Sequence, residues 1–125
     1  MEFDWHVIQE SWPLFVTASQ TTALLFAASL ILATLLGLIL ALMRISSIPP
    51  LVWASATFVW IFRGVPALVV LFFTFYGLPA LGLQLTAIQS GVLGLGVDAA
   101  AYKAEIIRSG IISVDRGQFE AAQAH

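Results

Sequence analysis

The stretch LLFAASLILATLLGLILAL, residues 24–42, contains no charged residue and is almost entirely aliphatic. It lies within a longer uncharged run that extends from Ser11 to Met43. A helix needs about 20 mostly apolar residues to cross the hydrocarbon core of a bilayer. The sequence therefore predicts a membrane-spanning helix over about residues 14–43, which ends before Arg44.

The composition of the whole chain agrees with this interpretation. Of its 125 residues, 60% are hydrophobic and only 10% are charged, and the mean hydropathy is +0.97. Soluble domains contain about 25% charged residues, so we expect a membrane protein. The uncharged run is longer than the apolar core of a signal peptide, about 7–15 residues, and we expect it to remain as an anchor. The chain has no cysteine and its histidines, His6 and His125, lie at opposite ends, so neither a disulfide nor a metal site is predicted.

Two further membrane helices are predicted. Pro49 and Pro50 form a turn after the first helix, and the second helix is expected over about residues 51–76. Pro66 removes a hydrogen bond inside it, so we expect a kink there. The third helix is expected over about residues 85–112. Its first half is rich in glycine, which lets neighbouring helices approach closely; these glycines are Gly91, Gly94 and Gly96.

The placement of basic residues predicts the orientation. Arg44 follows the first predicted helix and Arg116 follows the third, whereas the segment before the first helix is acidic. Loops that carry lysine and arginine usually stay in the cytoplasm. We therefore expect residues 1–16 outside the cell and the carboxyl terminus in the cytoplasm.

Polar residues inside these helices offer two interpretations each. Arg63, Gly64 and Pro66 could form a broken helix whose cation and freed backbone groups line a pathway, or Arg63 could extend its side chain to the headgroups at a kink. On the third helix, Asp98, Tyr102 and Glu105 share one stripe. This stripe could face a charged or zwitterionic solute, or it could form an ion-pair network, with Lys103 and Arg108, that holds the helices together.

The polar end of the chain, residues 113–125, is predicted to form a separate short helix from Asp115 to Ala124. Asp115 can cap this helix, and Gln118 stands at the position of a capping-box partner. Phe119 and the following Glu-Ala-Ala could dock into a groove of a partner protein. The alternative is an ordinary amphipathic helix that lies on the membrane.

Five motifs follow one another from about Thr17 to the end of the chain. They are Thr17-Ala-Ser-Gln-Thr-Thr22, Phe62-Arg-Gly-Val-Pro66, Leu71-Phe-Phe-Thr-Phe-Tyr-Gly-Leu-Pro79, Ala101-Tyr-Lys-Ala-Glu-Ile-Ile-Arg-Ser-Gly110 and Asp115-Arg-Gly-Gln-Phe-Glu-Ala-Ala122. Each motif is weak alone. In this order and spacing, the chain strongly resembles the polar amino acid branch of the ABC importer permeases.

The resemblance implies an all-α integral membrane fold: three transmembrane helices of a type I ABC importer permease, truncated before the remaining helices. Residues 17–125 would form an incomplete transmembrane domain, the amino-terminal part of a permease. The implied function is to translocate polar amino acids across the bacterial inner membrane. The chain would not be an enzyme and would hold no cofactor, because a separate cytoplasmic subunit binds ATP and Mg.

The resemblance also implies partners and site residues. A second permease subunit, identical or related, and a periplasmic or lipid-anchored solute-binding protein would complete the importer, and no nucleic acid is expected. The cytoplasmic helix that couples to the ATPase would contain Gln118, Phe119, Glu120, Ala121 and Ala122. The candidate translocation pathway contains Arg63, Gly64, Pro66, Asp98, Tyr102 and Glu105. The chain departs from the family pattern at Asp98 and Ala100, where an amide and a residue such as glycine are expected.

Two other functions remain compatible with the sequence. One is a truncated membrane scaffold that binds the ATPase or the partner permease and transports nothing. The other is a self-associating helical channel, which the polar third helix alone supports.

Overall fold

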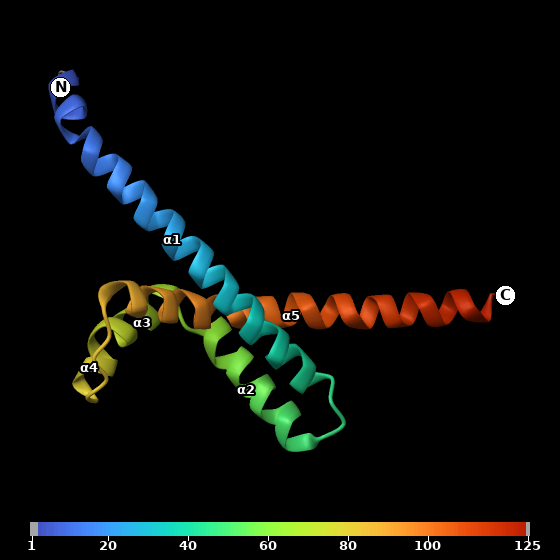
Figure 1. Ribbon diagram of the computed structural model, residues 1–125. Coiled ribbons are helices and arrows are strands. Elements are labelled where there is room, and N and C mark those ends of the chain that lie inside the picture. Colours follow the sequence, from blue (N-terminus) through green and yellow to red (C-terminus); the bar gives the residue numbers. More distant parts are fainter. Residues whose placement is uncertain (1–2, 125) are drawn as a thin grey trace.

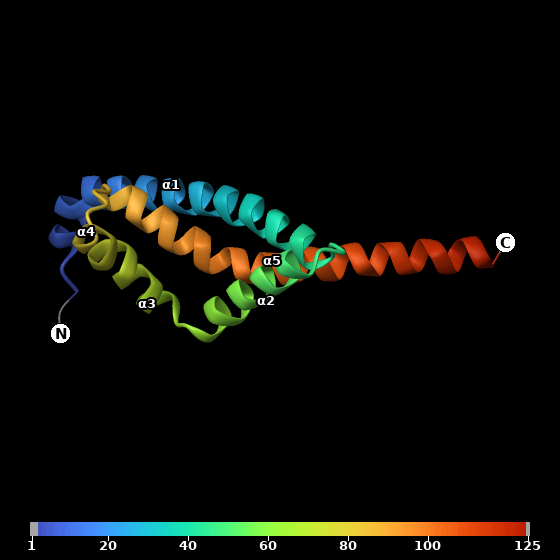
Figure 2. The same ribbon diagram turned by 90° about the horizontal axis from the view of Figure 1, so that it is seen from below.

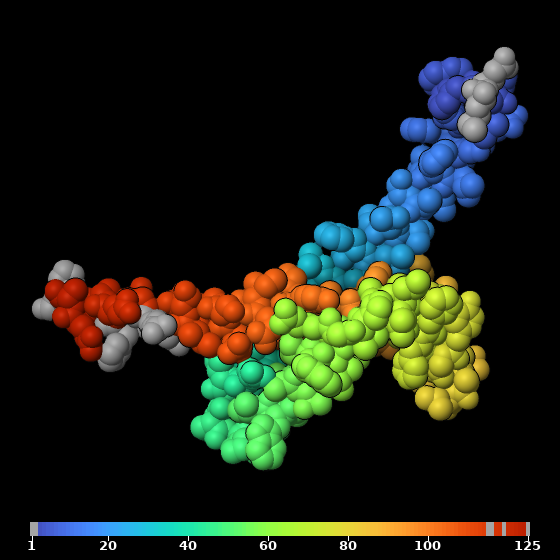
Figure 3. Space-filling view, turned by 180° about the vertical axis from the view of Figure 1, so that it is seen from behind, coloured from blue at the N-terminus to red at the C-terminus, as the bar shows by residue number. Residues whose placement is uncertain are grey.

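The computed structural model describes residues 3–124, apart from the side chains of Asp115, Arg116 and Phe119. All regular secondary structure in this range is helical. Its elements are α1 (Trp5–Arg44), α2 (Pro49–Gly64), α3 (Ala67–Phe72), the π-helical turn η1 (Phe73–Gly77), α4 (Leu78–Ala80) and α5 (Ala87–Gln123). The long helices α1 and α5 cross, and α2 lies beside the second half of α1 (Figure 1). The first half of α1 and the end of α5 project from this centre (Figure 3).

Helix α1 is longer than predicted, because it begins at Trp5 and not near residue 14. The Asp4 carboxylate caps it by accepting a hydrogen bond from the backbone N–H of His6 at 3.0 Å. Within residues 3–124, α1 is the one helix that is by itself long and apolar enough to cross a membrane. The predicted first membrane helix is therefore present, as the larger part of a helix of 40 residues.

The second predicted helix is broken at Pro66, where a kink was expected and where a broken helix was one of two interpretations. Helix α2 ends at Gly64, Val65 is extended with φ −100° and ψ 129°, and α3 begins after Pro66. The two halves, α2 and the segment from α3 to α4, meet at an angle of 103° and could form one span only as a bent pair. The cause is local, because proline disfavours a helical conformation in the residue before it as well as removing a donor.

Helix α5 runs without interruption through the segment that was predicted to be separate. It begins with a capping box, in which the Thr86 hydroxyl accepts from Gln89 N–H at 3.1 Å and the Gln89 side chain accepts from Thr86 N–H at 3.0 Å. The helix ends at Gln123, so the expected helix start at Asp115 was wrong. No proline occurs in this range, and glycines 110 and 117 each cost only about 1 kcal/mol relative to alanine.

The core lies where α1 and α5 cross, and it is built from small residues. A Cβ atom added to Gly37 of α1 would lie 2.7 Å from Lys103 Cβ and 3.2 Å from the backbone nitrogen of Ala104 on α5. Apart from the glycines, the buried residues that the structure describes on the two helices are Ser29, Ala33, Leu40, Ala41, Ser90, Ala100, Ala101 and Ala104, all small except Leu40. Small residues four apart on α1 thus let the two backbones approach closely, as they do in other membrane helix pairs.

The three predicted packing glycines are confirmed. A Cβ at Gly96 would lie 2.5 Å from Leu32 Cδ2 of α1, and one at Gly94 would lie 2.8 Å from the Thr74 hydroxyl of η1. One at Gly91 would lie 3.2 Å from a methyl of Leu25. The first half of α5 therefore packs closely on both α1 and η1.

Helices α1 and α2 are joined by a buried polar contact. The Ser55 hydroxyl, which is fully buried, donates a hydrogen bond to the Leu40 carbonyl at 2.6 Å. Hydrogen bonds between membrane helices contribute on average about 0.6 kcal/mol. This contact fixes α2 against the end of α1, which places the last turn of α2 next to α5.

Candidate functional site

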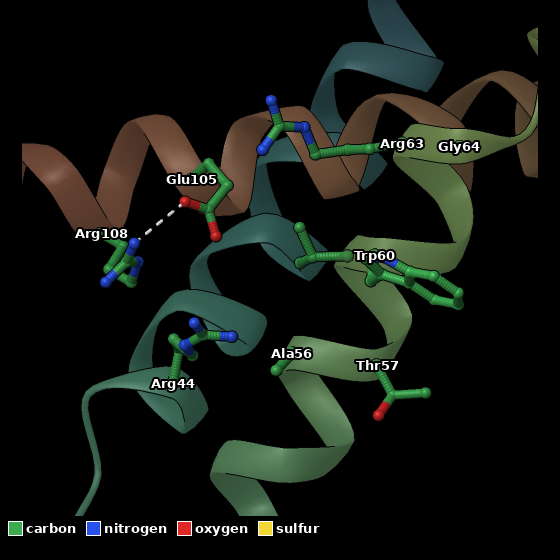
Figure 4. Close-up of a pocket in the computed structure, with 9 residues that line it drawn as sticks. Arg44, Ala56, Thr57, Trp60, Arg63, Gly64, Glu105 and Arg108 are labelled. Carbon is green, nitrogen blue, oxygen red and sulfur yellow. Dashed lines mark hydrogen bonds and ion pairs between the residues drawn. The ribbon is translucent and has the colours of Figure 1, made fainter.

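A cavity of about 880 Å³ opens between the end of α1, the second half of α2 and the middle of α5 (Figure 4). Arg44 comes from the last turn of α1, Arg63 from the last turn of α2, and Glu105 and Arg108 from α5. The full lining is Arg44, Ala56, Thr57, Val59, Trp60, Arg63, Gly64, Glu105 and Arg108. The break at Pro66 makes this site possible, because it ends α2 beside α5.

The lining is strongly cationic, with three guanidinium groups against one carboxylate. Arg108 Nη2 donates to Glu105 Oε2 at 3.1 Å, which confirms the predicted i,i+3 pair. Both side chains are half-buried, at 30% and 25% exposure. Arg108 Nε is buried and has no hydrogen-bond partner in the described part of the chain. The site therefore has positive charge and donor capacity left for an anionic group.

Arg63 links α2 to α5. Its guanidinium carbon lies 5.9 Å from the ring centroid of Tyr102, within the range of a cation–π contact. The side chain stands in the last turn of α2, where the negative end of the helix dipole favours a cation. The structure thus brings three of the predicted pathway residues together: Arg63, Tyr102 and Glu105.

The other predicted pathway residues occupy different positions. Gly64 lines the cavity, and a Cβ there would contact nothing within 4 Å. Pro66 lies outside the lining and forms the N-cap of α3. Asp98 also lies outside it, and its Oδ1 is buried without a hydrogen-bond partner among the described residues.

The alternative ion-pair network is reduced to a single pair. Glu105–Arg108 is the one salt bridge in the described part of the chain. The Cβ of Lys103 packs against Gly37 at the helix crossing. Sequence reasoning did not assign Arg44 or Trp60 to the site, and no local motif marks them. Their place depends on the antiparallel packing of α1 and α2.

The predicted ATPase-coupling residues lie in the last turns of α5. Gln118, Glu120, Ala121 and Ala122 are exposed there, and these described residues project away from the other helices (Figure 2). Phe119 belongs to the helix, but its side chain lies outside the described part of the chain.

Known proteins resemble the chain over nearly its whole length. It is 34% identical to the arginine transport system permease protein ArtQ of Bacillus subtilis (strain 168), over 99% of this chain and 57% of that protein. It is 40% identical to the L-cystine transport system permease protein TcyB of the same organism, over 94% and 50%. The probable amino-acid ABC transporter permease protein YckA of Bacillus subtilis (strain 168) is 37% identical, over 92% and 51%. The chain thus spans about half the length of the curated relatives it matches.

A solved structure agrees with these relatives. The crystal structure of an amino acid ABC transporter with histidines matches with a TM-score of 0.85 and 38% identity, and the match covers 99% of this chain and 58% of that chain. No protein-family model matches the sequence. The agreement of sequence and backbone shows that the chain belongs to the polar amino acid ABC transporter permease family.

Proposed function

We propose that this chain serves as a membrane-spanning permease subunit of an ATP-driven importer of polar amino acids in the bacterial inner membrane. The observation that carries the proposal is the joint match, 38% identity at a TM-score of 0.85, to a solved amino acid ABC transporter. Relatives whose names specify arginine and cystine transport support the same solute class. ATP hydrolysis belongs to a separate subunit, so the chain itself moves solute and catalyses no reaction.

The geometry of the cavity supports a solute pathway. The break between α2 and α3 exposes Arg63 at a helix end, and the contact with Tyr102 holds it toward α5. Broken helices with free termini recur at the midplane sites of membrane transporters. A polar amino acid carries a carboxylate that Arg63 can bind and an ammonium that Glu105 can bind. Gly64 leaves space beside them and Pro66 maintains the break, while Asp98 lies about two turns nearer the start of α5, outside the cavity lining.

Three partners complete the proposed importer. An ATP-binding subunit contacts the exposed end of α5, where Gln118, Phe119, Glu120, Ala121 and Ala122 stand. A second permease subunit, identical or related, packs beside this chain. A periplasmic or lipid-anchored binding protein delivers the solute from outside.

In the proposed topology, α1 spans once over about residues 14–43, the segments α2 to α4 form one broken span, and α5 spans over about residues 85–112. The amino terminus is outside and the end of α5 is cytoplasmic, as the basic residues indicate. The chain has no cysteine, so Ser113→Cys creates one labelling site. We expect this variant to resist an impermeant maleimide in intact cells and to react after the cells are opened. Labelling at equal rates in intact and opened cells would refute the orientation.

The proposed function is tested with a hybrid in which this chain replaces the aligned part of ArtQ in a Bacillus subtilis strain that lacks ArtQ. We expect the hybrid to restore uptake of a labelled amino acid, with arginine, cystine, glutamine and histidine assayed in turn. Uptake should stop when the gene of the ATPase subunit is deleted, which separates import from leakage through a channel. A hybrid that is inserted and binds its partners but restores uptake of none of them would instead support the scaffold function.

A further inference from the structure

Three residues of the cavity lining, two arginines and an exposed tryptophan, have no role in the proposed solute pathway. The two arginines lie at the end of the cavity beside the end of α1. Arg44 and Arg108 approach it from α1 and α5, and Trp60 lies further along α2, one turn before Arg63 (Figure 4). The apolar run of α1 ends at Met43, so in the proposed topology Arg44 stands where hydrocarbon gives way to headgroups. We call Arg44 and Arg108 the inner arginine pair.

The net positive charge of this region favours the binding of an anion. The three arginines of the cavity outnumber its one carboxylate, which gives the lining a formal charge of +2 at neutral pH. Glu105 accepts from Arg108 Nη2, whereas Arg108 Nε is buried and has no partner, and Arg44 forms no ion pair, among the side chains that the structure describes. A buried donor without a partner is unfavourable, and an anion that accepts from it removes this cost. A tetrahedral oxyanion fits such forked donors, because guanidinium groups bind phosphate oxygens in pairs.

The surroundings indicate that a lipid supplies this oxyanion. Trp60 is 78% exposed and its ring points away from the arginines, and the adjacent Ile61 is 43% exposed (Figure 4). An apolar surface at the mouth of a cationic cavity suits a molecule that has acyl chains as well as a phosphate. A free phosphate ion would gain nothing from these exposed side chains.

We propose that the inner arginine pair binds the phosphate of an anionic phospholipid of the cytoplasmic leaflet, with the acyl chains against Trp60 and Ile61. Basic pockets between membrane helices on the cytoplasmic side are suited to such headgroups. The inference rests on the membrane placement and orientation in the proposed function, and it assigns the inner end of the cavity to lipid and the Arg63 end to solute. A bound lipid would neutralise the cationic lining and hold α1 and α5 together at this level.

The test measures lipid preference on the intact chain. Membranes that contain the protein are first washed with alkaline carbonate, and the retained protein is then purified in mild detergent. It is titrated with an equal mixture of phosphatidylglycerol and phosphatidylcholine that carry the same acyl chains, and bound lipids are counted by native mass spectrometry. We expect phosphatidylglycerol to be preferred and Arg44→Gln to lower the preference about fivefold, the effect of one arginine near a charged headgroup.

Lys103→Gln is the matched control, because it also removes one positive charge from a residue that does not line the cavity and keeps the side-chain stem against Gly37. It should leave the preference unchanged. Arg44→Lys, which keeps the charge, should bind phosphatidylglycerol better than Arg44→Gln, and it serves as the test if the glutamine variant loses its helical circular dichroism. Equal preferences for phosphatidylglycerol in the wild type and in Arg44→Gln would contradict the proposed lipid site. Full displacement of phosphatidylglycerol by millimolar inorganic phosphate would contradict it as well. A protein absent from carbonate-washed membranes would instead contradict the proposed membrane function.

Discussion

Gly37→Ala is expected to destabilise the packing of α1 on α5 by about 1–3 kcal/mol, the usual cost of overpacking a close contact. The new methyl group would lie 2.7 Å from Lys103 Cβ and 3.3 Å from the Ala100 carbonyl oxygen, so the helices must separate at their crossing. The measurement uses fluorophores on cysteines introduced at Leu35 and Ile106, which are exposed positions on the two helices. Energy transfer between them is followed as SDS is added to the detergent-solubilised protein, and the variant should lose it at lower SDS.

Gly110→Ala provides the matched control. It makes the same chemical change inside α5, but nothing lies within 4 Å of the added Cβ. Alanine is better than glycine in a helix interior by about 1 kcal/mol, so this variant should be as stable as the wild type or more so. If Gly37→Ala and Gly110→Ala shifted the transition equally, the close crossing would not be a source of stability.

Arg63→Leu is expected to lower amino-acid uptake by the ArtQ hybrid about tenfold to 150-fold while the protein remains inserted. Hydrogen bonds to charged groups contribute about 1.5–3 kcal/mol, and leucine can neither bind a carboxylate nor keep the contact with Tyr102. Leucine also suits the bilayer better than arginine, so insertion should not decrease. Uptake is measured with labelled solute, and insertion by the amount of hybrid in carbonate-washed membranes.

Two conservative variants separate charge from geometry at this position. Arg63→Lys keeps the cation but loses the planar fork, so it should retain more uptake than the leucine variant and less than the wild type. Tyr102→Phe keeps an aromatic ring for the cation–π contact and should transport nearly as well as the wild type. Normal uptake by Arg63→Leu would leave Arg63 as a side chain that merely extends to the headgroups.

The features that were predicted correctly are those that the chain encodes locally. An uncharged run that extends to Met43 needs no tertiary information to specify α1. The glycines of α5 were identified as packing positions because a missing side chain favours close approach wherever the partner lies. The pair of Glu105 and Arg108 follows from helical spacing alone. In each case, residues near in sequence determine the outcome.

The features that were missed depend on how distant segments meet. The bend of 103° is an exception, because its cause lies in Val65 and Pro66 themselves; the sequence predicted a kink there and offered a broken helix as one of two interpretations. The repeat of small residues that includes Gly37 could have been read from the sequence, since its members are four apart. Its partner on α5 could not, because no local signal selects which face of α5 crosses it. The position of Arg44 in the cavity lining was missed for a similar reason, because it depends on how α1 packs against α2 and α5.

The unbroken course of α5 has a mechanical consequence. The helix is held near Ala104 at its crossing with Gly37 and extends freely toward Glu120. At 1.5 Å per residue, Glu120 lies about 24 Å beyond this crossing and Gly91 lies about 20 Å before it. The part of α5 before the crossing is held as well, because Gly91 and Gly96 pack against Leu25 and Leu32 of α1, whereas a tilt of about 10° beyond the crossing would move Glu120 by about 4 Å. A force applied at the exposed end of α5 would then pass through these packing contacts to α1.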